Sequence, residues 1–460
     1  MKSRVTLALA AVALVLLPAG PGQSAPERLT PEMRFDRAVE AAAADAAAAG
    51  AGAGQVAVVD GFEVVGHTGL GGGSVDFADV WAHGSYAYVG SRCGDPIVGG
   101  RGVSVVDIST ASSPHVVARL PNPDFSRAED VVVRHVDTAD FQGELAVVGV
   151  QVCFDSGHEE ETRTGLWFFD VTDAKHPALL SRWQLPLGDI GCHEVDLAQR
   201  SDGVVLAGCA HNFVDQAFVG TPAVEFVDVT DPHRPVSAST WTMQGVDPFG
   251  GLGCAPVIFA HSVRFQDGGR SAYVSYWDAG VVRLGLGDPS APRRTATTQI
   301  APPDEDGDAH STTLVRGGRW LVVNPEDTSP LDCPGASEFG GFGEAYVYRQ
   351  SADEHTQFLG TFSTPHSRSS SQGGVYTVHN TEAGNHGQFF SSWYSDGIVW
   401  WTMDKDGVST MRGQFVPKAS DTIGIPLVWG VYVQHSRDLV LASDLGSGLW
   451  ILRPVGADDI

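Results

Sequence analysis

Four histidines occupy the same position in four successive repeats of the sequence. Each lies 15 residues before the last residue of a short apolar segment, at Gly208, Tyr276, Pro325 or Tyr394. The four, called the histidine column below, are His193, His261, His310 and His379. Neutral imidazole is the commonest metal ligand and suits Fe, Cu and Zn. The spacing therefore predicts that the histidine column binds one transition metal, Fe, Cu or Zn.

Other residue types occupy this position in the remaining repeats. The same count in the seventh repeat gives Trp429, and the pattern places Asp79 and Asp130 at the equivalent position of the first two. Glu194 directly follows His193. Carboxylates beside metal ligands act as acid or base, or orient those ligands, so Asp79, Asp130 and Glu194 are the candidate catalytic residues. The alternative is that the histidines only stack on one another or hydrogen-bond to turns.

The elements that carry these residues belong to one repeated unit. Seven apolar segments of strand character begin at Gly102, Gly165, Ala223, Gly280, Glu344, Gly397 and Gly448. A hairpin precedes each segment, and a further strand follows six of them. Seven units of four strands predict an all-β fold, a seven-bladed β-propeller over residues 55–454, with 455–460 as a tail. The 55 Gly and 26 Pro residues agree with many short strands joined by turns.

The seventh unit has no fourth strand of its own. Phe62–Leu70 resembles the fourth strands of the other units and precedes the first one. We therefore expect it to close the ring by pairing with Leu449–Arg453, which would remove two open sheet edges. Because the first strand of each blade lines the channel of a propeller, the histidine column is expected at one mouth of that channel.

The cysteines map to the same face of the predicted propeller. They are Cys93, Cys153, Cys192, Cys209, Cys254 and Cys333. An even number in an exported chain favours disulfides. We favour Cys192–Cys209, which flank one hairpin, then Cys93–Cys153 between neighbouring blades, then Cys254–Cys333. Thiolate ligation of a metal beside His193 is the alternative.

Two resemblances extend this interpretation. The segment Val103-SVVDIS, with its trailing Ser-Pro, and Phe226-VDVTDPHRP resemble the LVIVD repeats of exported bacterial propeller proteins, over about residues 55–454. That likeness implies the propeller fold and no particular reaction. The segment that begins His261-SVRFQDGG resembles one blade of the selenium-binding, methanethiol-oxidase propellers, which implies a metal held by histidines. A centre of four histidines is similar, in ligand type alone, to the iron sites of carotenoid-cleaving propellers.

The ends and the charge of the chain bear on its location. Residues 1–25 read as a secretory signal peptide, with Lys2 and Arg4 before an apolar run. Residues 26–54 read as an Ala/Gly-rich helix, Thr30–Ala49, and a flexible linker, with a spacer or pro-segment role. We expect a secreted, extracellular protein that has no stable membrane anchor and is a monomer. The net charge of -26 argues against binding to nucleic acid or to anionic lipid.

Two functions of different classes remain open. The first is a metal-dependent oxidoreductase, an oxidase or oxygenase, that acts on a small molecule at the channel mouth. The second is a non-catalytic extracellular propeller that binds a protein or a glycan. The segment Asp304–Asp308 has part of a calcium-loop pattern, so calcium is a further candidate ligand there. A solvated acidic loop is the plainer explanation of that segment.

Overall fold

The computed structural model describes most of the predicted propeller. The described residues are 31–48, 58–71, 77–93, 101–153, 156–211, 223–246, 257–300, 307–328, 341–351, 355–368, 373–420, 423–457 and 460. The predicted signal peptide, the linker after the helix, Cys254 and Cys333 lie outside these residues. Within them, no helix combines the length and the apolar character that a membrane span requires.

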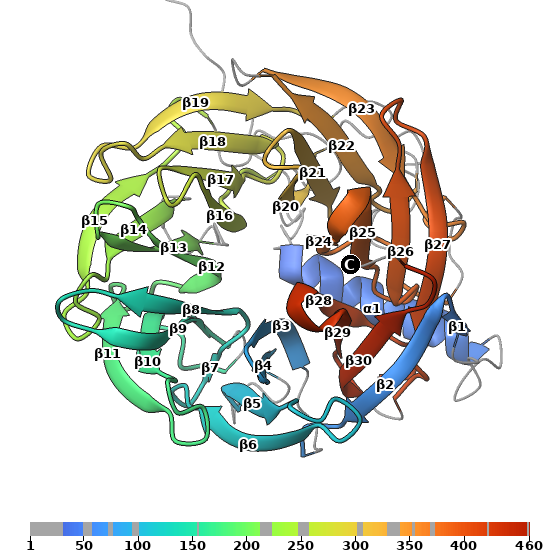
Figure 1. The fold of residues 1–460 in the computed structure, drawn as a ribbon, viewed down its shortest axis with the longest axis horizontal. Coiled ribbons are helices and arrows are strands. Elements are labelled where there is room, and N and C mark those ends of the chain that lie inside the picture. Colours follow the sequence, from blue (N-terminus) through green and yellow to red (C-terminus); the bar gives the residue numbers. More distant parts are fainter. Residues whose placement is uncertain are drawn as a thin grey trace, which may run out of the picture.

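The described residues form seven sheets arranged in a ring around a central channel (Figure 1). The strands of blade 1 are β3 (Phe77–His83), β4 (Tyr86–Ser91), β5 (Val103–Asp107) and β6 (His115–Leu120). Those of blade 2 are β7 (Ser126–Arg127), β8 (Val131–Asp137), β9 (Gln142–Val152), β10 (Gly165–Asp170) and β11 (Ala178–Gln184). Those of blade 3 are β12 (Cys192–Gln199), β13 (Val205–His211), β14 (Val224–Asp228) and β15 (Val236–Trp241). Those of blade 4 are β16 (Ser262–Gln266), β17 (Ser271–Ser275), β18 (Val281–Gly285) and β19 (Arg293–Thr298).

The remaining blades follow the same order from the channel outward. The strands of blade 5 are β20 (Ala309–Val315), β21 (Trp320–Pro325), β22 (Ala345–Gln350) and β23 (Thr356–Phe362). Those of blade 6 are β24 (Thr381–Ala383), β25 (Gln388–Ser392), β26 (Ile398–Met403) and β27 (Ser409–Val416). Those of blade 7 are β28 (Val428–Gln434), β29 (Leu439–Asp444), β30 (Gly448–Pro454) and β2 (Phe62–Thr68). Two short 3-10 turns lie at Asn385–Gly387 and His435–Arg437. The all-β, seven-bladed prediction is confirmed.

Local sequence explains the repeated third strand of each blade. In blades 1 to 3 this strand is almost fully buried and ends at an aspartate that organises the next turn, as β5, β10 and β14 show. Asp107 accepts hydrogen bonds from the hydroxyl and the backbone N–H of Ser109, at 2.6 and 2.9 Å. These bonds lower the pKa of Asp107 to about 2. Gly397 directly precedes β26 and has a φ of +75°. A Cβ there would lie 1.9 Å from the Phe415 carbonyl oxygen, so only glycine fits.

The N-terminal strand closes the ring, as predicted. Strand β2 pairs with β30 in antiparallel register from Phe62 opposite Pro454 to Thr68 opposite Leu449. A second short strand, β1 (Val58–Asp60), adds to the outer edge of blade 6 by pairing with β27. The sequence had not indicated β1, since three exposed residues carry no alternating pattern.

The predicted helix is present as α1 (Pro31–Ala48). Phe35, Ala38, Ala42 and Ala46 are buried along one face of the helix. In Figure 1 the helix runs from the central opening outward behind blades 6 and 7, and its apolar face packs on residues that include Tyr394. An apolar stripe of one Phe and three Ala therefore docks α1 on the propeller.

Ring closure predicts a sharp difference between two truncations. Deleting residues 26–54 removes α1 and keeps β2, so we expect the melting temperature to fall by only a few degrees. Deletion through residue 72 also removes β2 and leaves β30 as an open edge, so that protein should unfold or aggregate. Thermal denaturation and size-exclusion chromatography test both. Equal stability of the two truncations would contradict closure by β2.

Candidate functional site

The histidine column forms a continuous arc at one end of the channel. His193 lies in β12 and His310 in β20, while His261 and His379 lie just before β16 and β24. All four are at least 94% buried. Consecutive ring centroids are 4.4, 4.1 and 4.1 Å apart. The repeat spacing thus places the four imidazoles side by side.

Irregular backbone aims these side chains into the channel. The pairing of β12 with β13 slips between Cys192 and Val195, and the pairing of β20 with β21 slips between Ala309 and Ser311. A bulge of this kind redirects a side chain that regular alternation would turn away. The predicted disulfide Cys192–Cys209 fixes the bulge before His193, with Cα atoms 5.1 Å apart.

The second predicted disulfide, Cys93–Cys153, is also present and joins blades 1 and 2, with Cα atoms 5.7 Å apart. Because they form disulfides, Cys93, Cys153, Cys192 and Cys209 are excluded as thiolate ligands of a metal. The third pair, Cys254–Cys333, lies outside the described residues. So does most of Asp304–Asp308, of which Gly307 and Asp308 are described.

Backbone and side-chain acceptors fix the orientation of two imidazoles. The Nδ1–H of His379 donates to the Trp429 carbonyl oxygen at 2.8 Å, which leaves Nε2 with a lone pair and no hydrogen-bond partner. The Nδ1–H of His193 donates to Oε1 of Gln151 at 2.9 Å. Nδ1 of His261 and Nδ1 of His310 have no hydrogen-bond partner. In metal-binding histidines, one ring nitrogen commonly donates to a protein acceptor and so orients the ring, as Nδ1 does in His193 and His379.

Two glutamates face the central histidines. Oε1 of Glu194 lies 3.8 Å from Nδ1 of His261 and 4.0 Å from Nε2 of His310. Oε2 of Glu326 lies 3.7 Å from the same Nε2 of His310. Tyr394 donates its hydroxyl proton to Oε1 of Glu326 and so holds that carboxylate in place.

Two groups of three donor atoms result within the part of the chain that the structure describes. In each, the three atoms lie within 4.8 Å of one another. The groups are Glu194–His261–His310 and His310–Glu326–His379. His193 belongs to neither, although its ring contacts that of His261. The structure thus brings three of the four predicted ligands together with one predicted and one unpredicted carboxylate.

Burial controls the charge state of these residues. It lowers the pKa of His193, His261 and His310 well below the ordinary value and that of His379 to about 3. Burial also raises the pKa of Glu194 well above its ordinary value. The imidazoles are therefore neutral at pH 7, which is the state in which histidine binds a metal.

Asp79 and Asp130 do not occupy the position of His193. Val80, Val131 and Val195 hold equivalent places opposite the second strands of blades 1 to 3. Asp79 and Asp130 precede these valines directly, as Glu194 does, so they align with Glu194. Hairpin lengths differ in the first two blades, and the resulting one-residue error changes which side chain faces the histidines.

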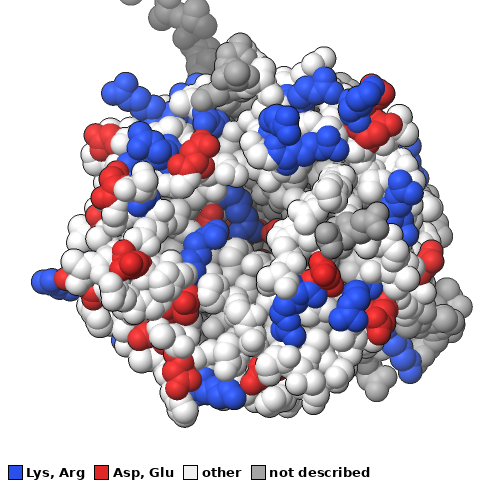
Figure 2. Space-filling model, in the orientation of Figure 1, with Lys and Arg blue, Asp and Glu red and all other residues white. Residues whose placement is uncertain are grey.

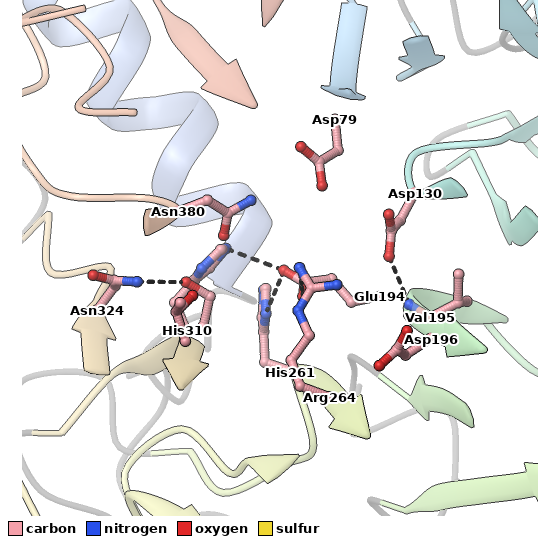
Figure 3. A network of polar contacts seen from close by, with 12 residues as sticks. Asp79, Asp130, Glu194, Val195, Asp196, His261, Arg264, His310, Asn324 and Asn380 are labelled. Atoms are coloured by element: carbon pink, nitrogen blue, oxygen red, sulfur yellow. Dashed lines mark hydrogen bonds and ion pairs between the residues drawn. The ribbon is translucent and has the colours of Figure 1, made fainter. Parts of the chain in front are cut away.

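The two aspartates have roles of their own within the channel. Oδ2 of Asp130 accepts the backbone N–H of Val195 at 2.7 Å and so joins blade 2 to blade 3. Asp79 accepts the N–H of Val80 at 2.8 Å. Burial raises the pKa of Asp130 to about 6 and that of Asp79 well above its ordinary value. Figure 3 shows both side chains apart from His261 and His310.

Helix α1 covers the end of the channel where the histidines lie. Phe35 packs on Tyr394 and Trp429 with ring centroids 5.0 and 5.3 Å away, and both of those rings contact His379 at 5.1 and 4.4 Å. The Arg92 guanidinium lies 5.0 Å from the centre of the Trp429 ring. Aromatic side chains therefore cover His379, the last member of the histidine column, on the α1 side.

Comparisons with known proteins support the fold alone. A solved structure, the WD40 β-propeller domain of Doa1, matches with a TM-score of 0.52 and 10% identity, over 86% of this chain and 98% of that one. No protein-family model matches the chain, and no curated protein does. The LVIVD and methanethiol-oxidase resemblances remain predictions.

The buried neutral state of His379 makes the metal-free protein sensitive to acid. Its pKa is about 3 in the folded protein and 6.5 in an ordinary environment, so below pH 6.5 the unfolded chain binds the extra proton. The contribution of neutral His379 to the free energy of unfolding is therefore complete above that pH and falls as the pH drops, by about 2 kcal/mol at about pH 5.

Denaturant unfolding with a chelator present, near neutral pH and at about pH 5, measures this effect. The loss of stability between the two pH values should be smaller in His379→Gln than in the unmodified protein. His176→Gln removes a histidine whose side chain is 83% exposed and should leave the loss unchanged. An undiminished loss in His379→Gln would show that His379 does not resist protonation.

Proposed function

We propose that the protein is a metal-dependent oxidoreductase whose metal binds at the histidine end of the channel. The observation that carries the proposal is the Glu194 carboxylate, whose Oε1 faces Nδ1 of His261, a buried ring nitrogen without a hydrogen-bond partner, and Nε2 of the neutral His310 imidazole. Buried polar atoms without partners are uncommon and call for a ligand or a water. Two histidines and one carboxylate are the ligand set of non-haem Fe(II) oxygenases.

The donor separations fit an ion after a small contraction. Neighbouring donors around an ion with bonds of about 2.05 Å lie about 3.3 Å apart in a tetrahedral site. The separations of 3.8 and 4.0 Å around Glu194 exceed that value by less than about 1 Å. Side-chain movements of that size in Glu194 and the two histidines would bring the donors to that separation. Each of the two donor groups is a possible position, called a seat below, for the ion. Glu326 and His379 complete the second seat. Both seats use Nε2 of His310, so the same ion would occupy one or the other.

The residues around the two donor groups orient the ligands and limit the access of water. A redox-active ion held by three protein donors would supply electron transfer to a small molecule bound at its open positions. Tyr394 holds Glu326, and the Trp429 carbonyl oxygen holds the His379 ring. Burial raises the pKa of Glu194 in the metal-free protein, and a bound ion would take the place of the proton on this carboxyl group. Phe35 and Trp429 limit the access of water from the α1 side.

Secretion is part of the proposal. The two disulfides of the described residues fit an oxidising compartment. Residues 1–25 have the charged and apolar segments of a signal peptide. Outside the cell the protein would obtain its metal after folding, through the channel or past α1.

Metal analysis tests the proposal. The tag-free protein should contain Fe, Cu or Zn at close to one ion per chain, and His261→Ala and His310→Ala should each remove most of it. His176→Ala changes an exposed histidine and serves as the control. Comparing Glu194→Gln with Glu326→Gln shows which seat the ion occupies. A protein that stays metal-free and whose melting temperature does not respond to added Fe(II), Cu or Zn would rule the site out.

A second measurement tests the open coordination positions that oxygen chemistry needs. Ferrous protein treated with nitric oxide, a substitute for O2, should give the EPR signal of an iron–nitrosyl complex. His310→Ala should lose this signal, while His176→Ala should keep it. Bound iron that gives no nitrosyl signal would mean that the site is closed and serves structure, not oxidation.

A further inference from the structure

A second layer of polar groups lies in the channel directly below the histidines. The layer lines a small pocket that opens into the channel. Its walls include Asp79, Arg264, Thr312, Asn380 and Glu382. Figure 3 shows Asp79, Asn380, Glu194 and Arg264 converging from different blades. All the donor atoms of this layer, apart from the guanidinium of Arg264, are oxygens or amide groups.

The layer carries an excess of acidic groups. Five carboxyl groups interact electrostatically with the Arg264 guanidinium. They are those of Asp79, Asp130, Glu194, Asp196 and Glu382. Two guanidinium groups oppose these five carboxyl groups, Arg264 within the layer and Arg134, which lies 3.2 Å from Asp196. The excess is three negative charges when every carboxyl group is ionised. Such an excess in a low-dielectric channel attracts a cation and repels an anion.

Three buried oxygens of this layer have no hydrogen-bond partner. They are Oε2 of Glu194, Oδ1 of Asn380 and Oγ1 of Thr312, in residues that are 5%, 6% and 2% exposed. Neighbouring hydroxyls are satisfied, since Ser311 donates to the His379 carbonyl oxygen at 2.7 Å and Thr313 donates to that of Thr381. Asn380 and Thr312 line the pocket, and Oε2 of Glu194 lies 3.9 Å from the guanidinium of Arg264, which also lines it. Unpartnered acceptors at one pocket indicate a bound ligand that offers positive charge.

We propose that a hard divalent cation, Ca²⁺ or Mg²⁺, binds in this pocket through oxygens of Asp79, Glu194, Asn380 and Thr312, with water completing its coordination. Oxygen-only donors select such ions, whereas the imidazoles above them select transition metals. The four donors come from four blades without a regular octahedral arrangement, so we expect Ca²⁺ to bind more tightly than Mg²⁺. The guanidinium of Arg264, 3.9 Å from Oε2 of Glu194, weakens binding without reversing the charge excess.

Glu194 connects this layer with the histidines. Its Oε1 faces His261 and His310, and its Oε2 belongs to the oxygen layer. Asp79 lies in blade 1, which carries no histidine of the column, so the two sites are separable by mutation. The pocket also lies toward the face of the ring shown in Figure 2, where a central hollow holds acidic and basic side chains together. A hydrated cation reaches the pocket from that face without displacing α1.

Terbium luminescence tests the proposal, because Tb³⁺ replaces Ca²⁺ and an indole ring nearby sensitises its emission. Trp81 lines the pocket and would be the sensitiser. The chelator-treated full chain should show sensitised Tb³⁺ emission that Ca²⁺ abolishes, with Mg²⁺ less effective and Na⁺ at equal ionic strength without effect. Asp79→Asn should weaken Tb³⁺ and Ca²⁺ binding at least tenfold, and Thr312→Val should weaken it several-fold.

Controls separate this site from the histidine site. Asp406→Asn removes a carboxylate that is 69% exposed and should bind Tb³⁺ as the unmodified protein does. His310→Ala should lose the transition metal and keep the Tb³⁺ signal, while Asp79→Asn should do the opposite. Thr312→Val removes one hydroxyl without a charge and covers the case in which Asp79→Asn does not fold. Absence of Ca²⁺-sensitive emission in the unmodified protein, or an unchanged signal in Thr312→Val, overturns the proposal.

Discussion

Removal of ionisable side chains from water inside the central channel determines most properties of this molecule. Burial keeps the four imidazoles neutral and raises the pKa of the carboxyl groups below them. A buried polar group costs stability unless a partner compensates for the lost water. Some groups find partners in neighbouring blades, as Asp130 does in Val195 and His379 in Trp429. The unpartnered ones define the places where a ligand would stabilise the fold.

The repeat made the architecture predictable, because each blade has the same alternation of apolar strands and turn residues. The fold, the closing strand Phe62–Leu70, two disulfides and the adjacency of the histidine column all followed from position within the repeat. This reasoning succeeds where the hairpin length is constant, since an equal count of residues then gives an equal place on the channel wall. His193 in blade 3 and His379 in blade 6 illustrate this, because they are the two ends of one continuous arc of imidazoles.

The repeat did not predict features that depend on segments of unequal length or on segments outside the repeated unit. Asp79 and Asp130 fell out of register because their hairpins differ in length. Glu326 joined the site from a loop after β21, where neither strand period nor repeat count applies, and its one sequence signal was an acidic residue next to a strand end. The docking of α1 depends on a surface assembled from blades 6 and 7, which an alanine-rich segment does not reveal.

The pairing of β2 with β30 imposes an order on synthesis and folding. Strand β2 leaves the ribosome early but cannot take its place in blade 7 until β30 has been made, since Phe62 pairs with Pro454. Blades 1 to 6 acquire their own strands in sequence, whereas blade 7 is complete only when the whole chain has been made. Contacts between such distant segments form slowly, and their edges stay exposed until then. A nascent chain interrupted before Gly448 would be an open arc with two unpaired edges, a form that proteases and chaperones distinguish readily from the finished ring.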